Sequence, residues 1–391
     1  MKILLTTVYD YPHAGGLSTH VTTLKAGLEA QGHTVDVLSF SDVPFLKQMF
    51  LAQGPSNIVN RIKKGRGIML GLYARQLLLQ KLIEKHKKRG YDIINAQDPY
   101  ATLASIPSGI PTVSTAHGYL SYEAVSKGSV KANSEEAKLL QNKEIISFQK
   151  TRRVITVDQR IKQYVSDVAG IEGTAIRNFI DVEGFKPDVE NRSLYKEKHQ
   201  VDNEKKVLFV PRRLTKKNGV IYPALAMKKI LTRYPETLLI YAGSGEDLPE
   251  IERVIKEDGI EKEVKLLGAI PHEKIKEYYS FSDIVLIPSI HSAGVEEATS
   301  ISALEAMGSG SPVIACAVGG LKEIINDDVD GILVEEQNVD ALADAVIRLF
   351  DQPELASEYA IKARAKIEAE YSHIAAAKKY AEIYEDVLGK K

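Results

Sequence analysis

The chain has 391 residues, which is enough for two domains that each bury a full hydrophobic core. Its hydrophobic content of 44% and charged content of 26% are those of an ordinary globular protein, and no apolar run approaches the roughly 18 residues of a membrane span. Residues 1–170 hold 22 of the 51 Lys and Arg residues and 13 of the 52 Asp and Glu residues, so this part is net +9 and the remainder is net −10. We therefore expect the two halves to meet different partners.

Most of the basic excess lies in residues 40–91, which carry 11 basic and 2 acidic residues. Within this block, NRIKKGRGIMLGLYARQLLLQKLIEKHKKRG has a helical pattern, with Leu and Ile on one side and Lys and Arg on others. The pattern fits either a helix with a solvated basic face or a peripheral surface for an anionic membrane or an acidic glycan. No nucleic-acid-binding motif accompanies it, so nucleic acid is not an expected partner.

The N-terminal stretch and the cysteine content bear on location. MKILLTTVYD lacks the long apolar region and the cleavage site of a signal peptide and is typical of a buried strand. Cys316 is the only cysteine, which excludes an internal disulfide and suits a reducing compartment. We expect a cytoplasmic protein, and peripheral contact with the cytoplasmic membrane face stays open.

Strand-like runs rich in β-branched residues alternate with helical patterns along most of the chain. In the first half, strands are predicted at residues 2–8, 34–40, 91–97, 112–117 and 153–158. A polar stretch at 178–205 breaks the alternation, and strands are predicted again at residues 206–212, 237–243, 263–268, 283–289 and 312–317. This order predicts an α/β fold with two doubly wound parallel sheets covered by helices on both faces. The final stretch indicates one amphipathic helix after a Ser372 cap.

In open parallel sheets, ligands bind beyond the carboxyl ends of the strands, so the loops that follow strands are the candidate sites. After the first strand, Gly15 and Gly16 precede a helix whose free N–H groups favour an anion, and their missing side chains let a phosphate approach. His20 follows about one helical turn later. A tight strand-to-helix turn explains the two glycines equally well.

Two further loops combine a strand end with polar side chains. His117 ends the strand TVSTAH, where it could contact a ligand hydroxyl or act as a general acid or base; a structural histidine is the alternative. In FVPRRLTKKNGV, a basic cluster precedes a helix that we expect to begin near Asn218. Its Arg and Lys side chains suit a diphosphate, and the alternative is a solvated basic surface. The cluster consists of Arg212, Arg213, Lys216 and Lys217.

The stretch GVEEATSISALEAMGSGSPVIA places Glu297 and Glu305 on either side of a helix start. Thr299 or Ser300 is the natural N-cap there, and free N–H groups at the turn would accept phosphate oxygens. Carboxylates repel phosphate but accept hydrogen bonds from sugar hydroxyls. In the alternative interpretation, Glu297 complements the helix dipole and Glu305 is a solvated helix residue. Together, the four loops predict a nucleotide diphosphate sugar held between two domains.

The sequence resembles the retaining glycosyltransferases of family 4 over essentially its full length. The E-x7-E motif at Glu297 and Glu305 is the strongest match. The other matches are GG-x3-H at Gly15, Gly16 and His20, T-x-HG at Thr115, His117 and Gly118, AIRNFIDVEGFKP at the domain junction, and YAGSGED with Gly243 and Gly245. The resemblance implies the GT-B architecture of two facing Rossmann-like domains. It implies an acceptor-binding domain at 1–185, a nucleotide-sugar-binding domain at 186–371 and a helix at 372–391 that returns to the first domain.

The resemblance also implies residue roles. The implied catalytic residues are His117, Arg212, Lys217 and Glu297. The implied donor-binding residues are Gly15, Gly16, Gly243, Gly245, Ala298, Thr299, Ser300, Ile301 and Glu305, of which Glu305 would hold the ribose hydroxyls. The family often has histidines after the third strand, where this chain has Asn95 and Gln97, and we place His20 and Gln97 on the acceptor side.

The pairing of the two cations departs from the family's R-x4-K-G pattern, because Asn218 stands between Lys217 and Gly219. If the family pattern is aligned on the preceding strand, its arginine is Arg212 and its lysine is Lys217. If it is aligned on Leu214, its arginine is Arg213 and Asn218 stands at the lysine position. We take the first pair, since a diphosphate needs a second cation.

The implied activity is transfer of a hexosyl-type sugar, with a UDP-sugar favoured as donor, to a hydroxyl of a glycan, lipid-linked or small-molecule acceptor. Asp328 and Asp330 lie in a predicted turn before Gly331 rather than in a DxD metal motif, so no metal and no other cofactor is expected. The alternatives are a nucleotide-sugar epimerase of the same architecture and a non-catalytic nucleotide-sugar-binding module.

Overall fold

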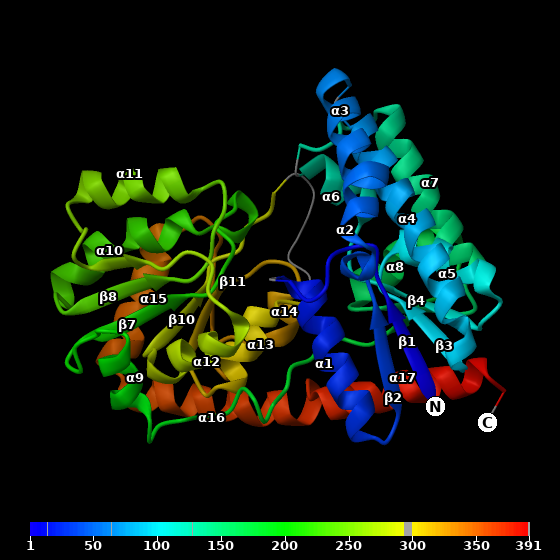
Figure 1. Cartoon of the computed structure of the whole chain (residues 1–391). Helices are drawn as coiled ribbons and strands as arrows, with labels where there is room; N and C mark the ends of the chain where they lie inside the picture. The colour runs from blue at the N-terminus through cyan, green and yellow to red at the C-terminus, as the bar shows by residue number, and fades with distance from the viewer. Residues whose placement is uncertain (14, 64, 127, 293–298, 390–391) are drawn as a thin grey trace. The chain divides into compact units, whose positions relative to one another are not determined.

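The computed structural model describes the whole chain except residues 14, 64, 127, 293–298 and 390–391. It divides into two compact units: unit 1 comprises Met1–Asn178 with His373–Lys391, and unit 2 comprises Phe179–Ser372 (Figure 1). Each unit is built on one six-stranded sheet with flanking helices. The predicted α/β fold class with two doubly wound domains is therefore confirmed.

The sheet of unit 1 has the strand order β2-β1-β3-β4-β5-β6, and every neighbouring pair is parallel. Its strands are β1 (Lys2–Thr6), β2 (Thr34–Leu38), β3 (Ile93–Ala96), β4 (Thr112–Ala116), β5 (Val154–Thr156) and β6 (Thr174–Ala175). All five residues of β4 are buried, as expected for a central strand covered on both faces. The two-residue strand β6 has no strand-like run in the sequence and was not predicted.

The helices of unit 1 supply the crossovers that parallel strands require. They are α1 (Gly16–Ala30), α2 (Phe45–Lys47), α3 (Gly54–Ile62), α4 (Arg66–His86), α5 (Pro99–Ser105), α6 (Leu120–Ser126), α7 (Glu135–Lys150), α8 (Gln159–Ala169) and α17 (His373–Val387), with the π-helical segment η2 (Gln48–Gln53) between α2 and α3. The 3₁₀ turns are η1 (Phe40–Asp42), η3 (Lys87–Arg89) and η4 (Ile106–Ser108).

The last helix, α17, belongs to unit 1, as the resemblance implied. It packs so closely on α1 that a Cβ atom on Gly27 would lie 2.6 Å from the His373 carbonyl oxygen. From the same helix, the Tyr384 hydroxyl accepts a hydrogen bond of 2.6 Å from Asn95 Nδ2 at the end of β3. The close helix contact and this buried polar contact together fix α17 on unit 1.

The sheet of unit 2 has the strand order β12-β11-β10-β7-β8-β9 and is parallel throughout. Its strands are β7 (Lys206–Val210), β8 (Thr237–Tyr241), β9 (Val264–Leu266), β10 (Ile284–Ile287), β11 (Val313–Cys316) and β12 (Ile332–Val334). Its helices are α9 (Arg192–Lys198), α10 (Ile221–Arg233), α11 (Leu248–Asp258), α12 (His272–Phe281), α13 (Ile301–Gly308), α14 (Leu321–Ile324), α15 (Val339–Asp351) and α16 (Pro353–Glu370), with a 3₁₀ turn η5 (Lys216–Asn218).

The boundary between the units lies earlier than expected. We placed it after residue 185, but Ile180, Val182 and Phe185 are buried in the core of unit 2. The backbone N–H of Ile180 donates to the Tyr371 carbonyl at 3.0 Å, which ties the first residues of unit 2 to its last ones. The boundary therefore falls between Asn178 and Phe179.

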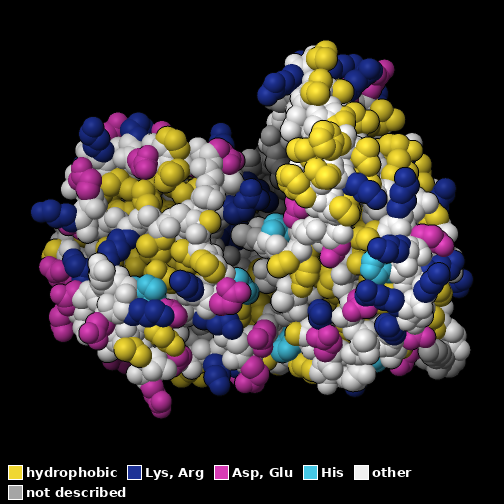
Figure 2. All heavy atoms as spheres, viewed as in Figure 1, with side chains coloured by type: hydrophobic (Ala, Val, Ile, Leu, Met, Phe, Trp, Pro, Cys, Tyr) yellow, Lys and Arg dark blue, Asp and Glu magenta, His cyan; other side chains and the backbone are white. Residues whose placement is uncertain are grey.

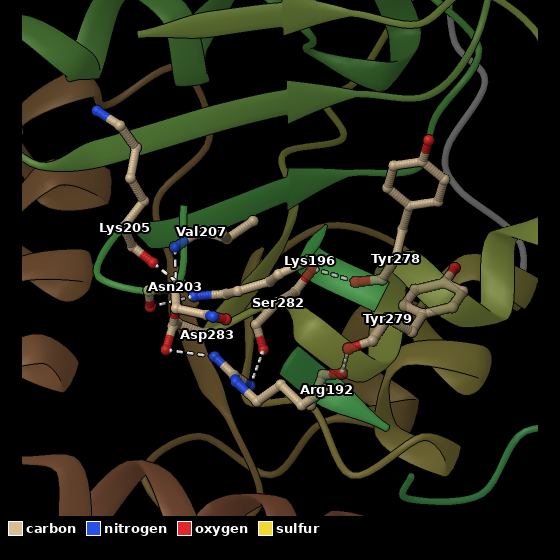
Figure 3. Close-up of polar contacts among 10 residues, drawn as sticks. Arg192, Lys196, Asn203, Lys205, Val207, Tyr278, Tyr279, Ser282 and Asp283 are labelled. Atoms are coloured by element: carbon tan, nitrogen blue, oxygen red, sulfur yellow. Dashed lines mark hydrogen bonds and ion pairs between the residues drawn. The ribbon is translucent and has the colours of Figure 1, made fainter. Parts of the chain in front are cut away.

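A set of polar contacts fixes the amino-terminal edge of the unit 2 sheet (Figure 3). Arg192 from α9 pairs with Asp283 Oδ1 at 2.8 Å, and the other oxygen of Asp283 accepts the Val207 N–H at 2.7 Å. Lys196 Nζ donates to the carbonyl oxygens of Asn203 and Lys205 at 2.9 and 2.8 Å. A cavity of about 220 Å³ adjoins Arg192 and Asp283, so it lies at the sheet edge opposite the loops predicted to bind ligand.

Candidate active site

Arg212 links two loops at the carboxyl edge of the unit 2 sheet. It follows β7 and is 8% exposed. Its Nη1 donates to Ser300 Oγ at 2.9 Å, and its Nη2 donates to Ser289 Oγ at 2.9 Å and to Asn218 Oδ1 at 2.7 Å. Both serines lie in the loop between β10 and α13, Ser289 just after β10 and Ser300 at the N-cap position of α13. A guanidinium presents several donors in a fixed plane, so one side chain holds the loop after β7 and the loop between β10 and α13 in register.

The structure distinguishes Arg212 from its neighbour Arg213, which is exposed. Among the described residues, Arg213 joins the network through its backbone, since its carbonyl oxygen accepts a 2.7 Å hydrogen bond from Asn218 Nδ2. Asn218, the residue that departs from the family pattern, thus links both arginines. Of the two alternatives left open by the sequence, Arg212 is the one at the centre of the loops.

Lys217 lies in the turn η5 and is exposed. Its carbonyl oxygen accepts the Ile290 N–H at 2.9 Å, which places this turn against the loop after β10. Gly219, in the left-handed conformation with φ of 60°, packs so closely that a Cβ atom would lie 1.9 Å from the Pro288 carbonyl oxygen. The following helix therefore begins at Ile221 and not near Asn218 as expected, since Gly219 interrupts the helical backbone.

Gly243 and Gly245 follow β8 and contact the Arg212 loop through the backbone. A Cβ atom on Gly243 would lie 1.9 Å from the Arg212 carbonyl oxygen, and one on Gly245 would lie 2.1 Å from that of Leu214. The Leu214 N–H donates to the Ser244 carbonyl at 3.1 Å. These glycines thus allow two loops to pack together, a role distinct from the donor contact that the resemblance implies for them.

The helix α13 begins where the sequence predicted it, with Ser300 as its N-cap. Thr299 and Ser300 are 6% and 1% exposed, and Ile301 is the first helical residue. The hydroxyl of Ser300 accepts from Arg212, so a cation stands at this helix N-terminus. Glu297 and Ala298 lie outside the described residues. The described part of this turn combines an arginine with free helix N–H groups, which both favour an anion.

Glu305 is 3% exposed, so the alternative interpretation of a solvated helix residue is wrong. Its Oε1 accepts from His272 Nε2 at 2.7 Å, and its Oε2 accepts from the Tyr279 hydroxyl at 3.1 Å. Both donors come from α12. The hydrogen bond to Glu305 raises the pKa of His272 from its ordinary value. A buried carboxylate with two donors is an oriented acceptor, as binding of sugar hydroxyls requires.

In unit 1, the two glycines lie at the start of α1. Gly15 is its N-cap, and Gly16 is its first residue. A Cβ atom on Gly16 would have no heavy atom within 4 Å, so among the described residues nothing covers this position. The structure therefore leaves room for a group to approach the first turn of this 15-residue helix.

His20 and His117 meet edge to face at the carboxyl edge of the unit 1 sheet, with ring centroids 4.5 Å apart. His117 Nε2 lies 2.9 Å from Gln97 Oε1, and His20 Nδ1 lies 3.0 Å from Asn178 Oδ1. His20 and Gln97 are each 1% exposed, whereas His117 is half-buried. His20 and Gln97 thus contact His117 and not solvent, and His117 is the member of the group that a ligand can reach.

Both histidines are neutral at physiological pH. Burial lowers the pKa of His20 to about 4, and burial and the neighbouring His20 lower the pKa of His117 well below its ordinary value. A neutral imidazole exchanges hydrogen bonds with hydroxyls, but it does not neutralise a phosphate. The unit 1 cluster therefore suits a sugar or acceptor hydroxyl.

A buried acid holds the backbone that follows His117. Glu144 of α7 is 1% exposed; its Oε1 accepts the Leu120 N–H at 3.0 Å, and its Oε2 accepts the Tyr164 hydroxyl at 2.6 Å. Burial raises the pKa of Glu144 to about 7. This side chain fixes the start of α6, three residues after His117, and sequence reasoning did not find it.

Other supporting residues also escaped the sequence analysis. They are Ser289, Asn178, His272, Tyr279 and Tyr380, and each contacts a predicted site residue. None stands in a pattern of its own, but Asn178 lies in the junction motif that supported the family resemblance. Among the described residues, no helix is long and apolar enough to cross a membrane, and no three His, Cys, Asp or Glu side chains gather as metal ligands.

Both halves of the chain match models of known glycosyltransferase families. Residues 191–366 match the model of glycosyl transferases group 1, and residues 14–183 match that of Glycosyltransferase Family 4. An uncharacterized glycosyltransferase of Methanocaldococcus jannaschii is 31% identical over 90% of this chain and 89% of its own length. The UDP-Gal:alpha-D-GlcNAc-diphosphoundecaprenol alpha-1,3-galactosyltransferase of Escherichia coli is 26% identical over 70% of this chain and 69% of its own.

Solved structures share the fold. The crystal structure of HepE from Anabaena in complex with UDP-glucose has a TM-score of 0.72 and 19% identity, covering 99% of this chain and 100% of that one. The chain belongs to glycosyltransferase family 4, and its fold is the GT-B fold.

Proposed function

We propose that this glycosyltransferase moves a hexosyl-type sugar from a UDP-sugar to a hydroxyl of a glycan, lipid-linked or small-molecule acceptor, with retention of the anomeric configuration and without a metal. It acts in the cytoplasm, since the single, buried Cys316 suits a reducing compartment. The observation that carries the proposal is the position of Arg212, whose guanidinium joins the loop after β7 to the loop between β10 and α13.

The donor diphosphate binds at this junction. Arg212 supplies a fixed cation, Lys217 supplies a second one on an exposed turn, and the first turn of α13 supplies backbone N–H groups. Glu305, oriented by His272 and Tyr279, accepts the ribose hydroxyls of the nucleotide. Arg212 thus binds the charged part of the donor, and Glu305 binds its hydroxyl-bearing part.

The reaction breaks the bond between the anomeric carbon and the diphosphate oxygen and forms one to the acceptor oxygen on the same face. The electron pair leaves with the nucleoside diphosphate, and the acceptor proton passes to an oxygen of this leaving group. Arg212 and Lys217 stabilise the negative charge that develops there, which is the main catalytic contribution. No side chain serves as a nucleophile in this scheme.

The acceptor and the transferred sugar meet unit 1. The neutral His117, held by Gln97 and His20, offers a hydrogen bond to a hydroxyl near the reacting carbon. A lipid-linked acceptor is supported by the name of the Escherichia coli relative, which describes a diphosphoundecaprenol-linked substrate and UDP-galactose.

The proposal is tested with a panel of UDP, GDP and ADP and their common sugars in a thermal-shift experiment with the full chain. We expect a UDP-sugar to raise the melting temperature most, because only a ligand bound to the native state stabilises it. The same donor, radiolabelled, should be hydrolysed slowly alone and consumed faster with an acceptor. NMR of the product should show the donor's anomeric configuration.

Other outcomes would contradict the proposal. A stronger response to GDP-mannose would replace the UDP-sugar as donor. An epimerised sugar from the donor alone would indicate an isomerase. Donor binding with neither hydrolysis nor transfer to any acceptor would indicate a binding module. An inverted product would exclude retention.

A further inference from the structure

Unit 1 carries a concentration of exposed apolar side chains on α2, η2 and α3. Their exposed fractions run from 54% to 84%, although large apolar residues usually scatter singly over a surface. They are Phe45, Leu46, Phe50, Leu51, Ile58 and Ile62, and we call them the apolar face. Figure 2 shows hydrophobic side chains gathered over the part of the molecule where Figure 1 draws α3 and α4.

The apolar face sits on a firm support. A Cβ atom on Gly67 would lie 2.2 Å from the Ser56 carbonyl oxygen, and one on Gly71 would lie 2.7 Å from Ser56 Oγ, so α3 and α4 cross in close contact. Ser56 Oγ also donates to the Gly67 carbonyl at 2.6 Å. Because the inner face of α3 is fixed on α4, its outer residues Ile58 and Ile62, one helical turn apart, stay directed outward.

The apolar face lies in a stretch of the chain where cations exceed acids. Residues 43–83 contain no Asp or Glu, and the exposed cations Lys47 and Arg61 lie among the apolar residues. Two further cations are shared with α7, since Glu136 lies 3.5 Å from Lys63 and 3.4 Å from Arg66. Exposed Phe, Leu and Ile beside an excess of Lys and Arg are the composition of surfaces that lie in the headgroup region of anionic bilayers.

We propose that the apolar face docks unit 1 on an anionic lipid bilayer, with Phe45, Phe50, Ile58 and Ile62 entering the boundary between headgroups and acyl chains and Lys47 and Arg61 contacting lipid phosphates. The excess of cations selects the bilayer over a second copy of the chain, because anionic headgroups attract a cationic surface whereas two copies of that surface repel each other. This docking does not depend on the proposed transfer reaction.

The test is sedimentation of the full chain with large unilamellar vesicles of phosphatidylcholine alone and of phosphatidylcholine with phosphatidylglycerol. We expect binding to the anionic vesicles that weakens as salt rises, and weaker binding to neutral ones. The double variant Phe50→Ser with Ile62→Ser should lose binding by about tenfold or more, since two apolar side chains no longer leave water. Lys47→Glu with Arg61→Glu should reduce binding to anionic vesicles only.

Ile361→Ser is the matched control, because Ile361 is 68% exposed on α16 of unit 2 and should leave vesicle binding unchanged. All variants should keep the wild-type melting temperature and rate of donor hydrolysis, which separates loss of docking from loss of the enzyme. Equal binding of wild type and F50S/I62S, or no binding to anionic vesicles, would overturn the proposal. So would a concentration-dependent dimer that F50S/I62S abolishes, which would assign the face to a second copy.

Discussion

The two units present different electrostatics at the same place in the fold. Unit 2 has charged groups beyond its strands, with the cation Arg212 and the buried Glu305 each held by neighbouring polar side chains. Unit 1 has the neutral pair His20 and His117, whose pKa values burial lowers. Charges suit a diphosphate and a ribose, whereas neutral imidazoles suit sugar hydroxyls. One sheet architecture thus carries loops of two chemical kinds, which differ through a few residues.

The largest effect should come from Arg212→Ala. We expect transfer to fall by about 100- to 1000-fold, because the variant removes a cation from the leaving group. It also leaves Ser289, Ser300 and Asn218 without that donor, so the melting temperature should drop. Steady-state kinetics and thermal melting measure the two effects. Arg213→Ala is the matched control and should stay near wild type; a greater loss there would reverse the assignment.

Lys217→Ala should cost about 3 kcal/mol of transition-state stabilisation, roughly 100-fold in rate. Because Lys217 is exposed, the melting temperature should change little, which separates it from Arg212. The neighbouring exposed Lys216 provides the control variant Lys216→Ala. Near-wild-type turnover of Lys217→Ala would remove this residue from the mechanism.

Glu144 and Glu305 are both buried acids, but only Glu305 has a histidine beside it. The pKa of Glu144 is about 7 in the folded state against 4.5 for the free side chain, so the folded state binds the proton more tightly. Its stabilising contribution is present below pH 4.5 and is lost as the pH rises to 7, by on the order of 3 kcal/mol. Between pH 5 and 8, wild type should therefore lose stability that Glu144→Gln keeps.

Urea unfolding followed by circular dichroism at both pH values measures this difference. Glu84→Gln, at an exposed acid of α4, is the control and should follow the wild-type pH dependence. A wild-type protein that is no less stable at pH 8 than at pH 5, relative to Glu144→Gln, would show that the carboxyl is ionised without penalty.

His272→Ala should raise the donor KM by about tenfold with little change in kcat, since Glu305 keeps only the Tyr279 donor. The raised pKa of His272 gives a pH signature. Its ion pair stabilises the fold fully below the unfolded pKa of about 6.5 and ceases to do so as the pH rises through the higher folded pKa. The melting-temperature difference between wild type and variant should thus shrink from pH 6 to 9. Lys274→Ala on the same helix should show neither effect.

The sequence predicts what local patterns encode. The β-branched runs formed the main strands, and the N-cap Ser300 stands where the helix begins, because propensity and capping act within a few residues. Local patterns do not predict the hydrogen-bond partners of the site residues. Ser300 lies 88 residues from Arg212, and His272 lies 33 from Glu305, so only the folded sheet brings each pair together.

Very short strands, isolated apolar residues in polar stretches and burial were also not predicted from the sequence. The strand β6 has two residues, too few for a periodic pattern. The unit boundary was placed late because Ile180 and Phe185 sit in a polar stretch, although they pack in the unit 2 core. The neutrality of His20 and His117 depends on burial, which no spacing of residues encodes.

The smallest expected effect is that of metal removal, for which we predict unchanged transfer in EDTA. Asp328 Oδ1 accepts from Arg348 at 2.6 Å and from the Tyr359 hydroxyl at 3.1 Å, and Asp330 Oδ2 lies 3.1 Å from Lys366 Nζ. These carboxylates are engaged in holding a turn, and in the proposed mechanism the cations that compensate the leaving group are Arg212 and Lys217. Activity lost in EDTA and restored by Mg²⁺ or Mn²⁺ would mean that Arg212 and Lys217 do not suffice for this charge. The side chains of unit 2 would then supply only part of the compensating charge, and a metal ion would supply the rest.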